Sequence, residues 1–405
     1  MSSTITGSNP NGVTLTDPSE SPVTVTSTGS ISSLPNGFAL YGASKFGQPD
    51  YHFPWDITNF GRITGSGTIS TGILLEGGGT IRNQLGGYIS GGRQGVSVAG
   101  VAGTVINSGS IAGTATLSTG VYLHADGTVA NLGSISGVKA GVQIKAADGS
   151  IANYGTIQST DTSFGYAVVL NASVSNHLSN SATGYIGEVY GLAITSGTAV
   201  GAATIVNSGV IHNGISLQSA GSVTNGSSGS TGGLISGGID IGNEPGTIVN
   251  YGSITNGSFD GVALRAGGSF RNAQASALVA PSKYAGDGVI IDGGPGTVGN
   301  LGTIAVYGTD GGSAVFLGNG GTVANGSSAV STAVLKDDLF VKDTGIEVRG
   351  AAGTVTNFGS ISGGYGVFLR AAGNVANAGT AAYIRGQYFA VVIQTTAANS
   401  RVTNL

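Results

Sequence analysis

Two short phrases of alternating apolar and polar residues recur along the chain. The first reads aliphatic, any residue, Asn, any residue, Gly, Ser or Thr, Ile, as in VINSGSI at 105–111 and VTNFGSI at 355–361. The second reads Gly or Ala, aliphatic, any residue, aliphatic, as in GVYL at 120–123 and GVFL at 366–369. This alternation is the periodicity of a half-buried β-strand. The pattern therefore predicts many short strands, and the sequence has no convincing helical stripe.

The two phrases repeat with the same period. The Asn of the first phrase recurs at a mean spacing of 24.6 residues, and the second phrase has sixteen copies between Val13 and Val391 at a mean spacing of 25.2. The equal periods indicate two sides of one structural unit. The Asn positions are 59, 83, 107, 131, 153, 176, 207, 225, 250, 272, 300, 325, 357, 377 and 404.

Strands this short cannot bury a face alone, but stacked coils can. The sequence therefore predicts an all-β protein, a single right-handed parallel β-helix (β-solenoid) of about 16 coils with about 25 residues per coil, continuous over residues 1–405. Aliphatic columns would fill the interior, the recurrent Asn would form an amide ladder, and the Gly two residues later would suit a tight corner. We interpret the clearest Asn residues as structural: Asn59, Asn83, Asn107, Asn131, Asn153, Asn250, Asn300 and Asn357.

The V-x-N-x-G-x-I phrase, repeated with G-V-x-L, resembles the repeats of bacterial autotransporter passenger domains and of haemagglutinin-like adhesins. The likeness covers almost the whole chain and is one of repeat style. It implies a β-helix that works outside a bacterial cell or on its surface. The first residues lack a basic start followed by an apolar stretch, so no Sec-type signal is predicted there.

Composition narrows the classes of function. Gly makes up 75 of 405 residues, 40% of residues are hydrophobic and only 8% are charged, which excludes charge-rich disorder. There is no cysteine, so disulfides and thiol chemistry are excluded. A net charge of −4 with 15 Lys and Arg gives no footprint for nucleic acid. No apolar run is long enough for a transmembrane helix, so we expect no membrane insertion.

Three segments lengthen their coils: 38–60, 273–287 and 326–344. The first is rich in aromatic residues and Pro, and we interpret it either as a plug that braces a joint or as an aromatic platform for glycan. The other two are predicted to be lateral loops. The aromatic residues of the first segment that we single out are Tyr41, Phe46, Tyr51, Phe53 and Trp55.

The third segment, 326–344, carries Asp337, Asp338 and Asp343 among lysines. Mixed charges of this kind are typical of a solvated loop. The alternative is a Ca²⁺ site, since hard cations bind clustered carboxylates. We expect the solvated loop, and we predict no metal and no cofactor.

If the coils stack in register, the sequence shows which outward residues become neighbours, so it can be searched for a pair of catalytic carboxylates. The residue after each second phrase forms an outward column in which no two carboxylates are adjacent. Asp240 and Glu347, at the centre of their phrases, are four coils or about 20 Å apart, whereas glycoside hydrolysis needs carboxylates within about 10 Å. We therefore expect no enzyme. The column also predicts an ion pair between Arg265 and Asp292.

The same outward column places Arg349 beside Arg370 on neighbouring coils. These arginines are interpreted as solvated side chains, with contact to an acidic glycan as the alternative.

The two ends of the sequence suggest self-assembly. RVTNL at 401–405 matches the first half of the Asn phrase, and MSSTITG at 1–7 resembles its second half. We therefore expect a homopolymer, in which the C-terminus of one copy and the N-terminus of the next complete a coil in an extracellular or cell-surface fibre. The predicted interface residues are Met1, Thr4, Ile5, Val13, Leu15, Val391, Ile393, Val402, Asn404 and Leu405.

Three alternatives stay open beside the fibre. The chain is a fragment of a longer repeat protein, or a monomeric adhesin stalk whose lateral loops bind polysaccharide or a cell surface, or a polysaccharide-cleaving β-helix enzyme. The fragment would explain the match between the two ends without any polymer.

Overall fold

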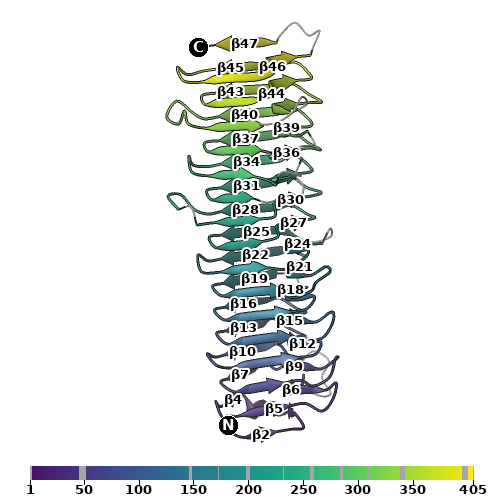
Figure 1. Cartoon of the computed structure of the whole chain (residues 1–405). Coiled ribbons are helices and arrows are strands. Elements are labelled where there is room, and N and C mark those ends of the chain that lie inside the picture. The colour runs from purple at the N-terminus through teal and green to yellow at the C-terminus, as the bar shows by residue number, and fades with distance from the viewer. Residues whose placement is uncertain are drawn as a thin grey trace. The chain divides into compact units, whose positions relative to one another are not determined.

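The chain is a parallel β-solenoid of about fifteen coils with about 25 residues per coil, which confirms the predicted fold class (Figure 1). The structure is a computed structural model, and it describes residues 2–44, 52–145, 148–171, 173–197, 201–230, 232–255, 260–282, 286–307, 311–337, 343–394 and 400–404. Over these ranges the only helical element is the 3₁₀ turn η1 (Pro18–Glu20), and none is long and apolar enough to cross a membrane.

Each coil contains three kinds of strand. The Asn strand ends at the recurrent Asn, the Ser-Ile strand carries the end of the first phrase, and the Gly-Val strand carries the second phrase. In one coil these are β16 (Gly127–Asn131), β17 (Ser134–Gly137) and β18 (Ala140–Ile144). Each pairs in parallel with the strand of its own kind in the next coil, because the phrases have equal periods.

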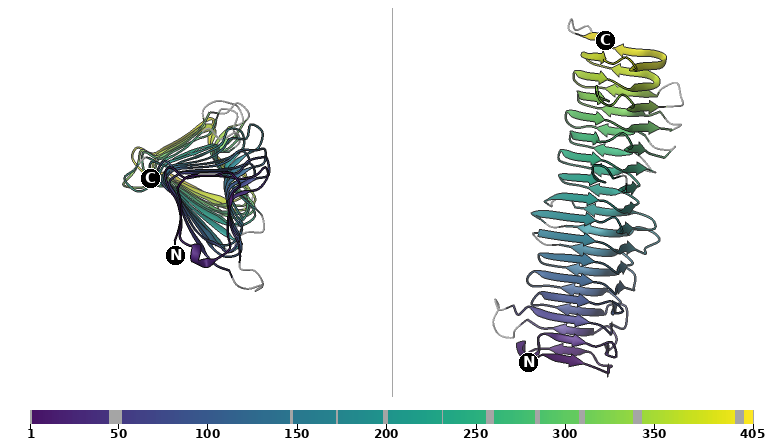
Figure 2. Two further views of the ribbon diagram at one scale, coloured as in Figure 1. Left: turned by 90° about the horizontal axis from the view of Figure 1, so that it is seen from below. Right: turned by 90° about the vertical axis from the view of Figure 1, so that its left-hand side faces the viewer.

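The chain forms two compact units, Met1–Thr204 and Ile205–Leu405, which we describe separately. Figure 2 shows the strands of the N-terminal unit, coloured purple to teal, stacked in parallel. Its further Asn strands are β1 (Ser3–Ile5), β4 (Val23–Val25), β7 (Trp55–Asn59), β10 (Gly79–Asn83), β13 (Gly103–Asn107), β19 (Asp148–Asn153) and β22 (Ser175–Asn180). Its further Ser-Ile strands are β2 (Ser8–Asn9), β5 (Ser30–Ser32), β8 (Arg62–Thr64), β11 (Tyr88–Gly91), β14 (Ser110–Gly113), β20 (Thr156–Ser159) and β23 (Tyr185–Gly187). Its further Gly-Val strands are β3 (Val13–Leu15), β6 (Phe38–Gly42), β9 (Thr71–Leu75), β12 (Gln94–Val98), β15 (Thr119–Leu123), β21 (Tyr166–Leu170) and β24 (Leu192–Ser196).

The C-terminal unit repeats the same order. Its Asn strands are β25 (Ala202–Asn207), β28 (Gly221–Asn225), β31 (Gly246–Asn250), β34 (Gly268–Asn272), β37 (Gly296–Asn300), β40 (Gly321–Asn325), β43 (Gly353–Asn357), β45 (Gly373–Asn377) and β47 (Arg401–Asn404). Its Ser-Ile strands are β26 (Val210–His212), β29 (Leu234–Ser236), β32 (Ser253–Thr255), β35 (Leu278–Ala280), β38 (Thr303–Val306) and β41 (Val334–Asp337). Its Gly-Val strands are β27 (Ile215–Leu217), β30 (Ile239–Ile241), β33 (Val262–Leu264), β36 (Val289–Ile291), β39 (Ser313–Leu317) and β42 (Thr344–Val348), and both kinds merge in β44 (Ser360–Leu369) and β46 (Tyr383–Ile393).

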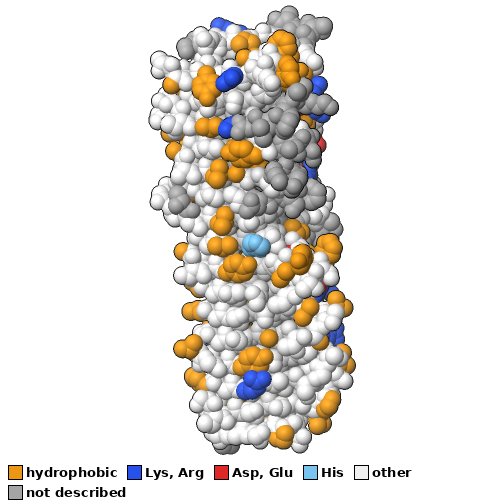
Figure 3. Space-filling view, viewed as in Figure 1, with side chains coloured by type: hydrophobic (Ala, Val, Ile, Leu, Met, Phe, Trp, Pro, Cys, Tyr) orange, Lys and Arg blue, Asp and Glu red, His pale blue; other side chains and the backbone are white. Residues whose placement is uncertain are grey.

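Aliphatic columns fill the interior of both units. Val129, Ile135 and Val142, one from each strand of a coil, are all fully buried. The alternate residues of the same strands face outward and are mostly small and polar, so the face in Figure 3 carries only scattered charged and apolar side chains. Burial of the aliphatic columns is therefore the main stabilising contribution to each coil.

A buried ladder of Asn side chains runs beside these columns. Asn250 Nδ2 donates hydrogen bonds to Asn272 Oδ1 at 2.9 Å and to the carbonyl oxygens of Gly252 and Leu278 at 3.1 Å. Its Oδ1 accepts from Asn225 Nδ2 at 2.8 Å. The N-terminal unit has the ladder Asn59, Asn83, Asn107, Asn131, Asn153 and Asn180, and the C-terminal unit has Asn207, Asn225, Asn250, Asn272, Asn300, Asn325, Asn357, Asn377 and Asn404.

The ladder passes through Asn180 and not through the expected Asn176. Both residues end an aliphatic-x-Asn triplet, but the register pairs Asn180 with Asn153 and pairs Asn176 with Gly149. The interval from Asn176 to Asn207 is 31 residues, whereas Asn180 lies 27 residues from both Asn153 and Asn207, so the spacing becomes even there.

At several ladder positions, the glycine two residues after the Asn is required by close packing at the corner. A Cβ atom built on Gly133 would lie 2.1 Å from the carbonyl oxygen of Gly109, the equivalent glycine one coil earlier. The same 2.1 Å approach recurs between Gly155 and Gly133. A side chain at either position would push neighbouring coils apart.

The three predicted insertions contribute strands to the solenoid as well as loops. Segment 38–60 contains β6 and β7, segment 273–287 contains β35, and segment 326–344 contains β41. Residues 45–51, 283–285 and 338–342 of these segments lie outside the described ranges.

Replacing one ladder residue should destabilise its coil strongly. In Asn250→Ala, Asn225 Nδ2 loses its acceptor and Asn272 Oδ1 loses its donor inside the protein, so we expect a loss of about 2–5 kcal/mol of unfolding free energy. The matched control is Asn319→Ala, at an exposed position of the same unit. Hydrogen exchange by mass spectrometry should show lost protection in β28, β31 and β34 of the first variant alone. Equal protection in both variants would contradict the structural role of the ladder.

Candidate functional site

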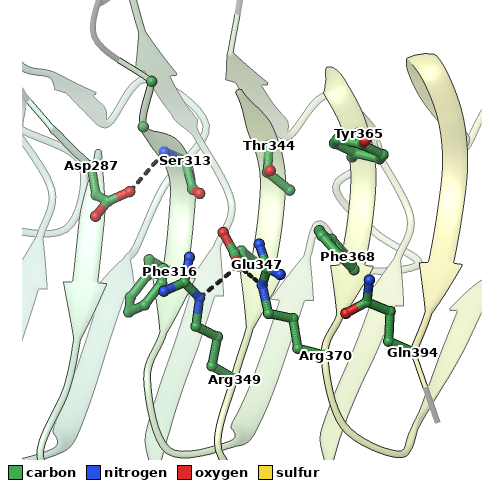
Figure 4. Close-up of a pocket in the computed structure, with 12 residues that line it drawn as sticks. Asp287, Ser313, Phe316, Thr344, Glu347, Arg349, Tyr365, Phe368, Arg370 and Gln394 are labelled. Carbon is green, nitrogen blue, oxygen red and sulfur yellow. Dashed lines mark hydrogen bonds and ion pairs between the residues drawn. The ribbon is translucent and has the colours of Figure 1, made fainter. Parts of the chain in front are cut away.

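A groove lies on the Gly-Val strands of the C-terminal unit. Its volume is about 580 Å³, and it crosses β39, β42, β44 and β46 (Figure 4). The residues that line it are Asp287, Gly311, Gly312, Ser313, Phe316, Thr344, Glu347, Arg349, Tyr365, Phe368, Arg370 and Gln394. It combines acidic, basic and aromatic side chains.

Strand register arranges the groove residues in rows. Ser313, Thr344 and Tyr365 occupy equivalent positions on neighbouring strands. Phe316, Glu347 and Phe368 form a second row three residues further along the strands. Successive members of a row are separated by the parallel-strand spacing of about 4.8 Å. Figure 4 shows the two rows, with Arg349 and Arg370 beyond them.

Glu347 holds both arginines of the groove. Its Oε1 accepts a hydrogen bond from Arg349 Nε at 2.7 Å and another from Arg370 Nε. Only 7% of Glu347 is exposed, whereas the two arginine side chains are 49% and 41% exposed. The hydrogen bond to Glu347 is the main cause that raises the pKa of Arg349. Two guanidinium groups on one carboxylate leave this cluster with a positive charge.

Each guanidinium also lies over an aromatic ring. The Arg349 guanidinium carbon is 4.9 Å from the centre of the Phe316 ring, and that of Arg370 is 4.3 Å from the centre of the Phe368 ring. These cation–π contacts and the shared carboxylate fix the orientation of both groups. The sequence placed Arg349 beside Arg370, but it did not reveal the carboxylate between them.

Asp287 provides an acidic group at the other side of the groove. One of its carboxylate oxygens accepts from the Ser313 backbone N–H at 2.7 Å, and its own backbone N–H donates to Asp260 at 2.9 Å. Burial, followed by the negative charge of Asp260, raises the pKa of Asp287 to about 7. Sequence reasoning missed this residue because it lies in the predicted insertion 273–287, three residues before a phrase centre.

The ion pair predicted between Arg265 and Asp292 is wrong. Arg265 pairs with Asp240 at 3.4 Å and with Asp260 at 3.1 Å. Asp292 instead accepts a hydrogen bond from the backbone N–H of Gly293 at 2.8 Å, so it is used in a local turn. The prediction assumed that Arg265 pairs with the next residue of its outward column. Its side chain instead contacts Asp240 on the preceding coil and Asp260, which lies just before its own strand.

Trp55 does not lie on an exposed aromatic platform, which is one of the two interpretations of segment 38–60. Trp55 is 1% exposed, its indole N–H donates to the Ala43 carbonyl oxygen at 3.0 Å, and Phe53 packs edge-on against it at 5.0 Å. Tyr41 donates to Glu76 at 2.5 Å, and burial together with this bond raises its pKa to about 12. Phe46 and Tyr51 lie outside the described residues. Trp55 is therefore a core residue of β7.

The three residues of the candidate Ca²⁺ site do not all lie in the described part of the chain. Asp337 and Asp343 are buried, and Asp338 lies outside the described residues. Within the ranges that the structure covers, no group of three His, Cys, Asp or Glu side chains is arranged to hold a metal ion.

The predicted interface residues lie in the first and last coils. At the start, Thr4 is exposed, Ile5 and Val13 are half-buried, and Leu15 is buried. At the end, Val391 and Ile393 are half-buried, Val402 is 57% exposed, and the exposed Asn404 accepts from Asn377 at 2.8 Å. Met1 and Leu405 lie outside the described residues.

The first strand lies in an unexpected column. The sequence suggested that residues 1–7 form the half of a coil that follows the Asn. Instead β1 pairs with β4, and β4 with β7, so that Ile5, Val25 and Asn59 share one column. Residues 3–5 therefore form an Asn strand without the Asn, and β2 forms the first Ser-Ile strand. The alternation of S-T-I resembles both halves of the phrase, and only pairing distinguishes them.

Comparison of the chain with models of protein families, with curated proteins and with solved structures finds no match.

The raised pKa of Asp287 predicts a pH-dependent stability. In the unfolded chain this carboxyl group titrates near pH 4, so its burial costs nothing at low pH and up to about 4 kcal/mol once the pH exceeds 7. Asp287→Asn, which stays neutral, should therefore raise the thermal midpoint at pH 8 and leave it nearly unchanged at pH 4.5. The exposed Asp292→Asn is the control and should change neither. Equal effects of Asp287→Asn at both pH values would contradict the burial of this carboxylate.

Proposed function

We propose that the chain is a structural solenoid subunit that extends by end-to-end stacking of copies outside a bacterial cell. The proposal rests on the apolar residues that the last coil leaves partly exposed. Core positions of β46 such as Val391 are half-buried, whereas the aligned Val367 on β44 is fully buried. A further coil stacked on β46 would bury them, as every interior coil does.

The same coil leaves apolar side chains exposed, including Val402, which aligns with the buried core residue Val375. Tyr383, Phe389 and Val402 are 54%, 60% and 57% exposed. β46 and β47 each pair on one side with the preceding coil, and within the described chain their other edge has no strand. Such an edge adds a strand through directional backbone hydrogen bonds. The occupant we propose is the first coil of a second copy.

The columns of β1 and β47 indicate how the joint forms. Both are Asn strands, and the strand order of the solenoid requires a Ser-Ile strand after β47. The order stays continuous if β47 of one copy replaces β1 of the next and β2 follows it. Val402 would then stack on Val23 of the second copy, where β1 has Ser3. Thr403 would keep the match of Thr4 with Thr24, and Asn404 would take the place of Ile5 on Val25. This strand replacement takes the place of the simple completion of a half-coil.

The proposed location outside the cell is supported by the resemblance to passenger and adhesin repeats and by the small polar outer surface. We propose no catalytic role and no cofactor. A second candidate function, a monomeric surface stalk that binds glycan, is favoured by the groove on the C-terminal unit, which replaces the predicted loops as the binding site.

Electron microscopy of negatively stained, tag-free protein tests the assembly. We expect filaments of constant width from the unmodified chain, and single particles from Val402→Asp and from a chain that lacks residues 401–405. The control is Leu85→Asp, which places the same charge at a lateral position that is 85% exposed and should leave filaments intact. Single particles from the unmodified chain across a range of concentrations, checked by light scattering, would overturn the proposal.

Removal of residues 2–6 separates strand replacement from plain stacking. If β47 replaces β1, this truncation should lengthen filaments or speed their growth, because the competing strand is gone. If the truncated chain assembles less than the unmodified one, stacking proceeds without replacement.

A further inference from the structure

The groove on the C-terminal unit has the features of an anion site. Arg349 and Arg370 follow equivalent positions, Val348 and Leu369, on β42 and β44. Both donate through Nε to the same oxygen of Glu347, so these bonds do not use their terminal nitrogens. Among the described residues, every hydrogen bond of these two guanidinium groups ends on Glu347. Planar guanidinium groups held in this way suit bidentate binding of a carboxylate or related oxyanion.

Aromatic side chains lie on the same face. Phe316 lies on β39, one strand before β42. Tyr365 packs against Phe368 with ring centres 5.3 Å apart. Tyr365 also lies 5.8 Å from Tyr388 and 6.2 Å from Phe389, so the aromatic surface continues onto β46. Such surfaces pack against the apolar faces of sugar rings, while the exposed Gln394 offers hydrogen bonds to hydroxyl groups.

Charge distinguishes among anionic ligands. The two arginines and Glu347 leave about one positive charge in their cluster, which ionised Asp287 across the groove would offset, and the chain carries a net charge of −4. Nucleic acids and densely sulfated polymers need many cationic contacts. One well-oriented positive site beside aromatic rings fits a ligand with a single carboxylate among neutral hydroxyl groups.

We propose that this groove binds an acidic oligosaccharide, with a uronate carboxylate on Arg349 and Arg370 and sugar rings against Phe316 and Tyr365. The inference names the ligand class for the second candidate function and does not depend on end-to-end assembly. Binding can be measured on single particles such as Val402→Asp, so failure of one proposal leaves the other to its own test.

The groove should also respond to pH. Asp287 faces Asp260, Glu347 and Arg349, and Asp260 is in turn paired with Arg265. When Asp287 ionises, with a pKa of about 7, it adds negative charge near the carboxylate site. We therefore expect affinity for an acidic ligand to fall between pH 6 and pH 8, and Asp287→Asn to abolish this fall.

Calorimetric titration with oligogalacturonate tests the proposal, with the methyl-esterified oligomer of the same length as the uncharged ligand. We expect binding of the acid form, with affinity lowered about tenfold or more in the ester and in Arg370→Gln. Arg82→Gln, at an arginine of the N-terminal unit that pairs with Asp56, is the control and should bind within twofold of the unmodified chain. Tyr365→Ala leaves both Arg–Glu hydrogen bonds and both cation–π pairs in place, and it should weaken binding even if Arg370→Gln disturbs the fold.

Three results would overturn the proposal. The first is no binding of the acid form at millimolar concentration. The second is equal affinity for the acid and the ester. The third is equal affinity for inorganic sulfate or for a sulfated oligosaccharide, which would make the groove a general anion site.

Discussion

The buried Asn ladder is the constraint on which the rest of the structure depends. Each interior ladder amide donates both hydrogens and accepts on its oxygen only when the next coil is in register. An unpaired amide in this position would cost about 1–3 kcal/mol for each lost partner. A shift of one residue would also move every aliphatic side chain of a strand to the outside. Within each unit, the ladder and the aliphatic columns therefore select the same alignment.

In-register stacking determines where chemistry can be placed. Outward side chains at one position of the repeat become neighbours about 4.8 Å apart on successive coils, although they lie 20–30 residues apart in sequence. Glu347 on β42 therefore meets Arg349, which directly follows β42, and Arg370, which directly follows β44. Substituting outward residues changes this surface without touching the interior, so a solenoid can carry a binding groove and an assembly edge on one scaffold.

The repeat period, the strand types and the inward and outward positions could all be predicted from the sequence, because alternation and spacing are properties of the chain itself. Three other features could not be predicted in this way. Asn176 and Asn180 both fit the phrase, and only pairing with Asn153 decides between them. Asp287 lies outside the phrases, so its place in the groove depends on the path of a loop. The burial of Trp55 depends on its position at the start of β7, which composition does not reveal.

The most direct test of this account is the side-chain amide exchange of the Asn residues, observed by NMR on selectively ¹⁵N-Asn-labelled protein. The account predicts two classes. Interior ladder side chains such as Asn131 and Asn250 should keep their NH₂ signals for hours in D₂O, while exposed ones such as Asn319 should lose them within the first spectrum. Rapid loss of all Asn side-chain signals would contradict a buried ladder and, with it, the register on which the groove and the assembly edge depend.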